Sequence, residues 1–172
     1  MTTCLAEPTA DHATALDISI VDDVGDVEGP DVELRLQRAL RGYLDAVARE
    51  LGVGLESCTL DIDLPTSAYL AVDRRLPDFP DRDLALLWDE ECGWAAAIET
   101  HSGEDLIIVS YLDTDTVAPP PGLVARFLHE LATDRPRLAR SDPFPQRVVG
   151  DHRQLVHDLV SATHQDRVGS TI

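Results

Sequence analysis

The chain has 172 residues, the size of one ordinary domain, and 32 acidic side chains outnumber 14 basic ones, for a formal charge of −18. No apolar run approaches the roughly 20 residues of a membrane-spanning helix, and no basic segment followed by an apolar one opens the sequence. These features exclude membrane-spanning and secreted classes, and we expect a cytoplasmic protein.

The charge is unevenly distributed along the chain. Residues 1–33 carry nine acidic and no basic side chains, whereas residues 135–172 carry four acidic and six basic ones. Affinity for nucleic acid depends largely on neutralising phosphates, so the acidic balance argues against such a partner. The C-terminal arginines form the one segment suited to phosphate contact.

The composition divides the chain into three parts. Residues 1–31 are acidic and lack partners for their charges, which predicts disorder, although the alternating residues 16–21 could add an edge strand or dock on a partner. Residues 32–134 are expected to form an α+β core domain. Residues 135–172 are expected to form a Pro/Arg-rich linker and a C-terminal helix.

Apolar spacing predicts three helices. The first begins near Asp31, which can cap its N-terminus, and ends at Gly52, which tolerates a left-handed cap. Its apolar stripe recurs every three or four residues. The second helix follows the proline triplet at 119–121 and spans about 122–133, and the last spans about 149–163. The stripe of the first helix comprises Leu36, Leu40, Tyr43, Val47 and Leu51.

Between the first two helices the apolar period changes to two, which predicts an antiparallel meander of about five strands. A connection at Glu91-Cys92-Gly93 sets Trp88 opposite Ala96, and a turn at Ser102-Gly103 sets Trp94 opposite Tyr111. The face predicted to form the main core then contains Leu86, Trp88, Trp94, Ala96, Ile98, Ile107, Val109 and Tyr111.

The opposite face of this sheet is also apolar but consists mostly of small side chains. A bare face of this kind would be a sizeable exposed patch, so we expect a helix, a second subunit or a ligand to cover it. Its members are Ala85, Leu87, Ala95, Ala97, Leu106, Ile108 and Leu112.

The run from Leu84 to Trp94, with Trp-Asp-Glu before Gly-Trp, precedes a proline triplet and an apolar helix. Over residues 35–134 this pattern resembles an actinobacterial family of small proteins known only as a domain of unknown function. The order of helix, meander and helix more weakly resembles the secretion-chaperone-like fold. That resemblance implies binding of protein segments and dimerisation, as a fold-level analogy.

Few residues suggest catalysis or metal binding. The acidic pairs Asp61/Asp63 and Asp113/Asp115 lack the spacing of a calcium loop, and the six histidines lack the spacing of a metal site on one helix. The three cysteines, Cys4, Cys58 and Cys92, predict neither zinc nor a disulfide framework. We therefore expect no metal, no cofactor and no catalytic residue.

The leading hypothesis is a non-enzymatic binding or adaptor protein. It acts as a homodimer or with a protein partner, through the small-residue sheet face or the terminal helix. One alternative is a small-molecule-binding protein or small enzyme with a pocket near Trp88, Trp94, Tyr111 and Glu99, and another is a regulator that touches nucleic acid through the C-terminal arginines. The candidate binding residues are Trp88, Trp94, Glu99, Tyr111, Leu87, Ala95, Ala97 and Ile108.

Overall fold

A computed structural model describes residues 30–100, 105–133 and 136–169. Three helices and six strands follow one another in these ranges. They are α1 (Pro30–Leu51), a 3-10 turn η1 (Leu55–Ser57), β1 (Cys58–Asp61), β2 (Ser67–Val72), β3 (Leu84–Asp89), β4 (Gly93–Glu99), β5 (Leu106–Leu112), α2 (Pro121–Ala132), β6 (Ala139–Arg140) and α3 (His152–Gly169).

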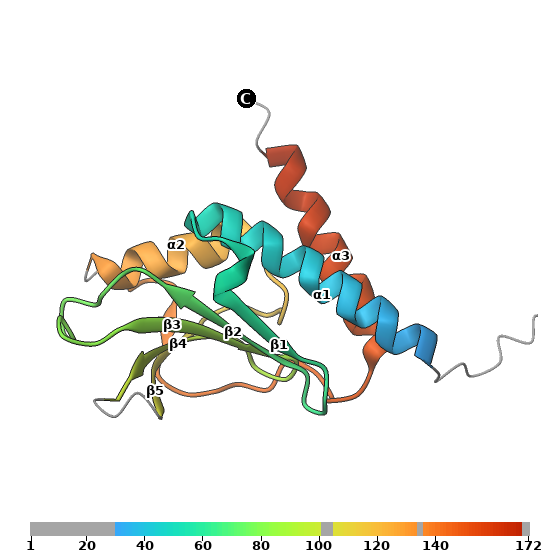
Figure 1. Ribbon diagram of the computed structural model, residues 1–172, viewed down its shortest axis with the longest axis horizontal. Coiled ribbons are helices and arrows are strands. Elements are labelled where there is room, and N and C mark those ends of the chain that lie inside the picture. Colours follow the sequence, from blue (N-terminus) through green and yellow to red (C-terminus); the bar gives the residue numbers. More distant parts are fainter. Residues whose placement is uncertain (1–29, 101–104, 134–135, 170–172) are drawn as a thin grey trace, which may run out of the picture.

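The strands form one antiparallel sheet in the order β1-β2-β3-β4-β5-β6, so each strand pairs with its neighbour in sequence. This meander, with helices before and after it, confirms the α+β class. All three helices lie on one side of the sheet (Figure 1). The protein is therefore a two-layer structure in which helices cover one face of the sheet.

The core lies between these two layers. The predicted stripe of α1 is buried, and Phe127 and Leu128 of α2 join it beside the inward side chains of β2, β3 and β4. Helix α3 packs along α1, and its buried residues Leu155 and Leu159 belong to the same apolar cluster. The C-terminal helix is thus part of the core.

The register of the β3–β4 hairpin differs from the prediction. Trp88 pairs with Trp94, and Leu86 pairs with Ala96, because Asp89 and Gly93 form the last pair. Asp89 Oδ1 accepts the backbone N–H groups of Glu91 and Cys92, which closes the turn early. Glycine suits position 93 for two reasons. Its backbone φ of 77° disfavours other residues, and a Cβ would lie only 3.2 Å from the Val117 Cα.

A β-bulge in β5 overturns the predicted face of several residues. Ala97 pairs with Ile108 but Ala96 pairs with Ser110, which leaves Val109 as the extra residue. Side chains beyond the bulge therefore change face. Tyr111 pairs with Ala95 on the face opposite the core, while Leu112 is fully buried in the core. Ile107, predicted in the core, is 50% exposed near the start of β5.

The segment expected as a linker is held to the hairpin by polar contacts. The Glu90 side chain is fully buried and pairs with Arg147, and it accepts backbone N–H groups from Thr66 and Gly150. The N–H of Gln146 donates to the carbonyl oxygen of Glu91 at 2.8 Å. This segment therefore crosses the end of the sheet in a fixed position and includes β6.

Three features of the sequence lie outside the described residues. They are the alternating residues 16–21 within the acidic segment, Cys4, and the turn at Ser102-Gly103. Among the described helices, none is long and apolar enough to cross a membrane.

Candidate functional site

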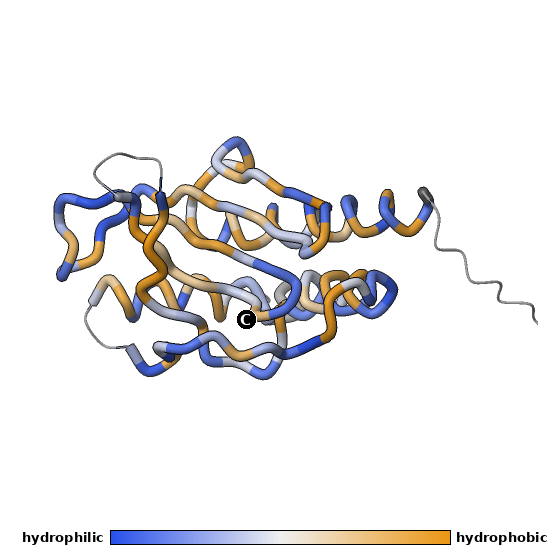
Figure 2. The backbone as a smooth tube through the Cα atoms, turned by 90° about the horizontal axis from the view of Figure 1, so that it is seen from below, coloured by the Kyte–Doolittle hydropathy of each residue, from blue (hydrophilic) through white to orange (hydrophobic). Residues whose placement is uncertain are grey.

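The sheet has a second face that none of the described helices covers. Figure 2 views the molecule from this side and shows the strands in front of the helices. Ala85, Ala95 and Ala97 lie on this face and are buried by their neighbours, but they are not part of the core cluster. We call this surface the open face.

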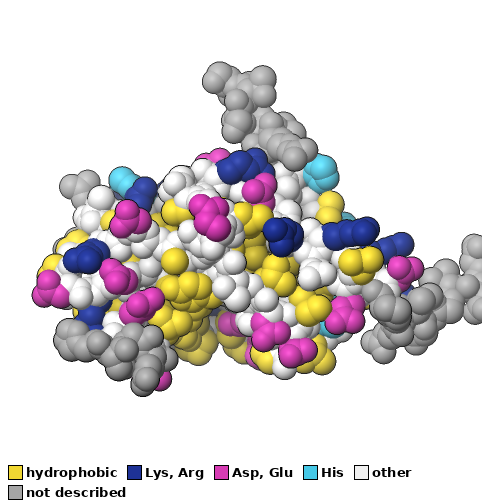
Figure 3. Space-filling view, viewed as in Figure 1, with side chains coloured by type: hydrophobic (Ala, Val, Ile, Leu, Met, Phe, Trp, Pro, Cys, Tyr) yellow, Lys and Arg dark blue, Asp and Glu magenta, His cyan; other side chains and the backbone are white. Residues whose placement is uncertain are grey.

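The open face contains a hollow of about 340 Å³. Leu87 and Ala95 belong to its central strands, and the larger side chains of Tyr69, Ile108 and Tyr111 border them. Figure 3 shows hydrophobic side chains gathered at the lower edge of the molecule, below the helices, with acidic side chains on both sides. The complete lining is Thr59, Asp61, Ser67, Ala68, Tyr69, Leu87, Trp88, Asp89, Ala95, Leu106, Ile108 and Tyr111. We call this hollow the open-face groove.

Two carboxylates, those of Asp61 at the end of β1 and Asp89 at the end of β3, line the groove. Asp89 Oδ1 is held by the N–H groups of Glu91 and Cys92, and Asp61 Oδ1 accepts the N–H of Asp63 at 3.0 Å. The backbone therefore fixes how both carboxylates are presented. Among the described residues no cationic side chain lines the groove, so its charged groups are acidic.

Glu99 and Tyr69 form a hydrogen-bonded pair on the open face. The Tyr69 hydroxyl donates to Glu99 Oε1 at 3.1 Å. Partial burial, followed by the interaction with Glu99, raises the pKa of Tyr69, and partial burial also raises the pKa of Tyr111. Both phenols are therefore neutral at physiological pH. The Tyr111 hydroxyl can donate to a ligand or peptide carbonyl, whereas the Tyr69 hydroxyl already donates to Glu99 and its oxygen can accept from an N–H group.

The eight candidate binding residues divide between the two faces of the sheet. Trp94 is fully buried on the core face, and Trp88 is only 1% exposed, at the border of the groove. The other six, Glu99, Tyr111, Leu87, Ala95, Ala97 and Ile108, lie on the open face. The structure thus brings six candidates together on the open face, and Trp88 and Tyr111 both line the groove, whereas Trp94 lies on the core side of the sheet.

Both indole N–H groups are used inside the core. Trp88 Nε1 donates to the carbonyl oxygen of Val117 at 2.7 Å. Trp94 Nε1 donates to the Tyr43 hydroxyl at 3.0 Å, and that hydroxyl donates to the carbonyl oxygen of Pro119 at 2.7 Å. These bonds tie the sheet to α1 and to the segment before α2, which is a structural role.

Sequence reasoning missed the outer part of the groove, formed by β1 and β2. Thr59, Asp61, Ser67 and Tyr69 line it there, and Asp89 lines the groove at the end of β3, but none of the five was among the candidates. The alternation of side chains along β2 could have revealed it. Ala68 and Leu70 are buried on the core side, so Ser67 and Tyr69 must lie on the other face of the sheet. Extending the alternation argument from the central strands to β2 would have included Tyr69.

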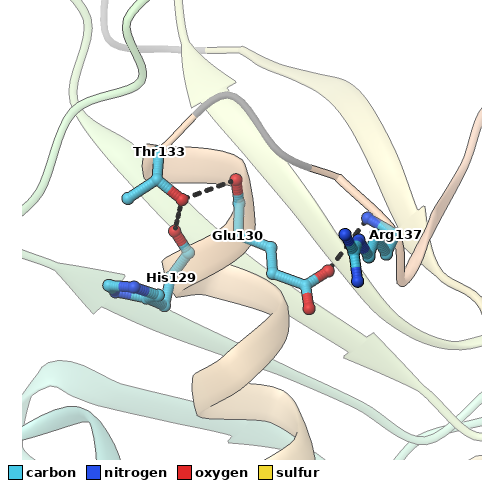
Figure 4. A pocket seen from close by; sticks show the side chains of 4 residues that line it. All are labelled: His129, Glu130, Thr133 and Arg137. Carbon is cyan, nitrogen blue, oxygen red and sulfur yellow. Dashed lines mark hydrogen bonds between the residues drawn. The ribbon is translucent and has the colours of Figure 1, made fainter.

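A second hollow, of about 490 Å³, lies at the C-terminal end of α2 (Figure 4). Its Glu130 carboxylate and Thr133 hydroxyl already have partners. Glu130 Oε2 accepts the N–H groups of Arg137 and Leu138, which lowers the pKa of Glu130, and the Thr133 hydroxyl donates to the carbonyl oxygen of His129 at 2.9 Å. We interpret this region as the polar end of a helix, not as a binding site.

Within the part of the chain that the structure describes, no group of three or more His, Cys, Asp or Glu side chains could hold a metal ion. Two of the C-terminal arginines have internal roles: Arg147 pairs with Glu90, and Arg140 stacks on Phe144 with 5.1 Å between the guanidinium carbon and the ring centre. The open-face groove is therefore the main candidate site.

A family model matches residues 43–130, from the middle of α1 to near the end of α2. The chain belongs to the family of unknown function DUF6292. No curated protein and no solved structure matches the chain. The part of this DUF6292 protein that the family model matches contains the groove and the bonds from Tyr43 to Trp94 and Pro119.

Proposed function

We propose that this DUF6292 protein is a non-enzymatic binding or adaptor protein that takes up a polypeptide segment on the open face of its sheet. The single observation that carries the proposal is the open-face groove itself. It presents aliphatic and aromatic side chains on a sheet face that the helices of the described chain leave uncovered.

The shape of the groove suits an extended chain. Ala95 lines the groove with a small side chain between the larger Tyr69, Ile108 and Tyr111, so a peptide can lie between these larger neighbours. Tyr111 offers its hydroxyl hydrogen to a peptide carbonyl, and the oxygen of Tyr69, which donates to Glu99, can accept a peptide N–H. Aromatic side chains with a polar tip are common anchors in protein interfaces.

The charge of the groove indicates the chemistry of the partner. Asp61 and Asp89 line it, and the whole chain has a formal charge of −18. Electrostatic complementarity favours a partner that carries lysine or arginine beside its apolar side chains. The proposed ligand class is therefore a basic, apolar polypeptide segment.

With this function we propose a cytoplasmic location and an actinobacterial origin, both argued from the residues of the chain. The cysteines that the structure describes, Cys58 and Cys92, are not in disulfides, which is usual for cytoplasmic proteins. The tryptophan-acid-acid and glycine-tryptophan motifs support an actinobacterial origin.

The test uses two fluorescent peptides of about twelve residues. In one peptide leucine or valine alternates with arginine, and in the other glutamate replaces each arginine. We expect the arginine peptide to bind and to bind more weakly as salt is raised, because salt screens its attraction to Asp61 and Asp89. Fluorescence anisotropy of the full chain measures both affinities.

The matched variants are Ala95→Trp and Val148→Trp. The first fills the groove, and the second adds the same side chain at a position that is 81% exposed elsewhere. We expect Ala95→Trp to weaken the arginine peptide at least about tenfold and Val148→Trp to leave its affinity unchanged. Equal binding of both peptides, or normal binding to a folded Ala95→Trp protein, contradicts the proposal.

A further inference from the structure

Strand β5 has an outer edge that is only partly paired. Its neighbour β6 has two residues, which pair with Tyr111 and Leu112. No other strand in the described ranges lies beside residues 106–109 on that side. Pro143 follows shortly after β6 and lacks the N–H group that would continue the ladder.

The backbone groups that point outward from this edge can be identified. The Thr100 N–H donates to the carbonyl oxygen of Asp105 at 2.9 Å, so the backbone groups of Asp105 point toward β4. Successive residues of an antiparallel strand alternate in this respect. Leu106 and Ile108 therefore direct their N–H and carbonyl groups away from β4, toward the outer edge.

The side chains along this edge are apolar. Leu106, Ile107 and Ile108 are 39%, 50% and 43% exposed. Proteins that keep a strand edge unpaired usually protect it with lysine, proline or a very short strand. Residues 106–108 carry no lysine or proline, and the bulge at Val109 and the two-residue β6 lie beyond them, so this part of the edge is open to pairing with another strand.

We propose that the strand is β5 of a second copy of this chain, paired antiparallel about Ile107. In this register Leu106 of each copy lies opposite Ile108 of the other, so four outward backbone groups per copy form four hydrogen bonds between the copies. The two sheets join into one continuous sheet of twelve strands, twice the six of a single chain. A two-fold axis through the Ile107 pair makes the contact self-complementary, as a symmetric dimer requires.

The charges at the two ends of the edge favour this antiparallel arrangement. Asp105 stands at the start of the exposed edge, and Arg140 pairs with Tyr111 at its other end. Antiparallel pairing brings Asp105 of one copy toward Arg140 of the other, twice by symmetry. The Arg140 guanidinium donates to the carbonyl oxygen of Phe144 and lies 3.8 Å from Asp113 Oδ1, a distance that leaves it able to pair with a second carboxylate.

Another candidate occupant is the segment at residues 16–21 of the same chain. Residues 1–29 contain seven acidic and no basic side chains, so this segment brings no cation toward Asp105. Moreover, α1 begins at the right end of the molecule in Figure 1, whereas β5 lies toward the left. The second copy is therefore the occupant that the charges favour.

The dimer also affects the groove. Leu106 and Ile108 belong both to the edge and to the lining of the open-face groove. Pairing about Ile107 therefore places the grooves of two copies next to each other on one sheet. Such a dimer presents two sites to one partner and gains affinity through a raised effective concentration.

Disulfide trapping tests the register. In a full chain with Cys4→Ser, Cys58→Ala and Cys92→Ser, the variant Ile107→Cys places two thiols directly opposite, about 4.5 Å apart between Cα atoms, which a disulfide can span. The matched variant Ile108→Cys faces Leu106, so its two thiols are beyond the roughly 7 Å limit. We expect mild oxidation at micromolar concentration to cross-link the first variant and leave the second monomeric on a non-reducing gel.

Sedimentation equilibrium gives an independent measurement. Ile108→Pro removes an outward N–H group without removing a β4–β5 hydrogen bond, so we expect the dimer to dissociate at least about tenfold more readily. Val160→Lys, on the exposed side of α3, and Ala95→Trp, in the groove, should leave the dimer unchanged. A monomer at all concentrations, a dimer insensitive to Ile108→Pro, or cross-linking of Ile108→Cys instead of Ile107→Cys overturns the inference. Because Ala95→Trp spares the edge, peptide binding and dimerisation can fail separately.

Discussion

At the scale of single residues, the Tyr43 hydroxyl is the point where three parts of the fold meet. It accepts the indole N–H of Trp94 in the sheet and donates to the carbonyl oxygen of Pro119 before α2. Burial raises the pKa of Tyr43 far above its ordinary value, so the hydroxyl stays protonated and keeps both bonds. The ring also contributes to the core, with 6.2 Å between its centroid and that of Trp94.

The substitution Tyr43→Phe keeps the ring and removes the hydroxyl. It leaves a buried indole N–H and a buried carbonyl oxygen without this partner, and each such loss costs about 1–3 kcal/mol. We expect the free energy of unfolding to fall by about 2–4 kcal/mol in urea titrations. The matched change Tyr69→Phe removes a partly exposed hydroxyl and should cost less than about 1 kcal/mol. Similar losses for both variants would contradict a special role for Tyr43.

At the scale of elements, the buried Glu90 holds together the β3–β4 hairpin, the start of β2 and the segment before α3. Burial alone raises the pKa of this carboxyl, but the N–H groups of Thr66 and Gly150 and the Arg147 guanidinium outweigh it, so the pKa of Glu90 lies below its ordinary value. A carboxyl with a lowered pKa in the folded protein stabilises it while ionised. The stabilisation by the Glu90 carboxylate is complete above the pKa of the group in the unfolded chain, and it is lost as the pH falls through its lower pKa in the folded protein.

We therefore expect the free energy of unfolding to decrease as pH falls below about 4.5, the ordinary pKa of glutamate. Glu90→Gln should lower stability near pH 7 and flatten this decrease, because glutamine does not titrate there. Urea unfolding from pH 3 to pH 7 measures both effects. The exposed Glu50→Gln serves as the control and should follow the parent protein. A parallel curve for Glu90→Gln would show that this carboxyl does not carry the acid sensitivity.

Also at this scale, the alternating pattern was sufficient to predict five strands, the side of the sheet taken by Leu86, Trp88 and Trp94, and the alanines of the open face. It could not predict the extra residue at Val109, since a bulge between valine and serine has no sequence signature. That one residue moved Tyr111 from the predicted core to the groove. Strand β6 was missed because its two residues lie among prolines and pair only through the tertiary fold.

At the scale of the whole molecule, the three helices and the sheet share one core. Leu155, Leu159 and Ala162 of α3 are buried against α1 and belong to the same cluster as Trp88 and Trp94. The sequence predicted the helix but not its packing, because the prolines between residues 136 and 145 are typical of a linker. We infer that the C-terminal helix and the sheet unfold together.

The pair Leu159→Ala and Val160→Ala tests this inference. Leu159 is fully buried, so its truncation should cost about 2–5 kcal/mol, whereas its neighbour Val160 is 41% exposed and should cost less than about 1 kcal/mol. The readout is the near-ultraviolet signal of the two tryptophans, which sit in the sheet. If Leu159→Ala loses helical signal while the tryptophan transition keeps its midpoint, α3 is a separate unit.

The buried Glu90 has a consequence for biosynthesis. The ribosome makes the β3–β4 hairpin before Arg147, which follows Glu90 by 57 residues in the chain. Until Arg147 leaves the exit tunnel, the nascent hairpin holds an acid that can be buried only at the cost of an unpaired charge. Burial of the Glu90 carboxylate is thereby coupled to synthesis of the segment that carries Arg147.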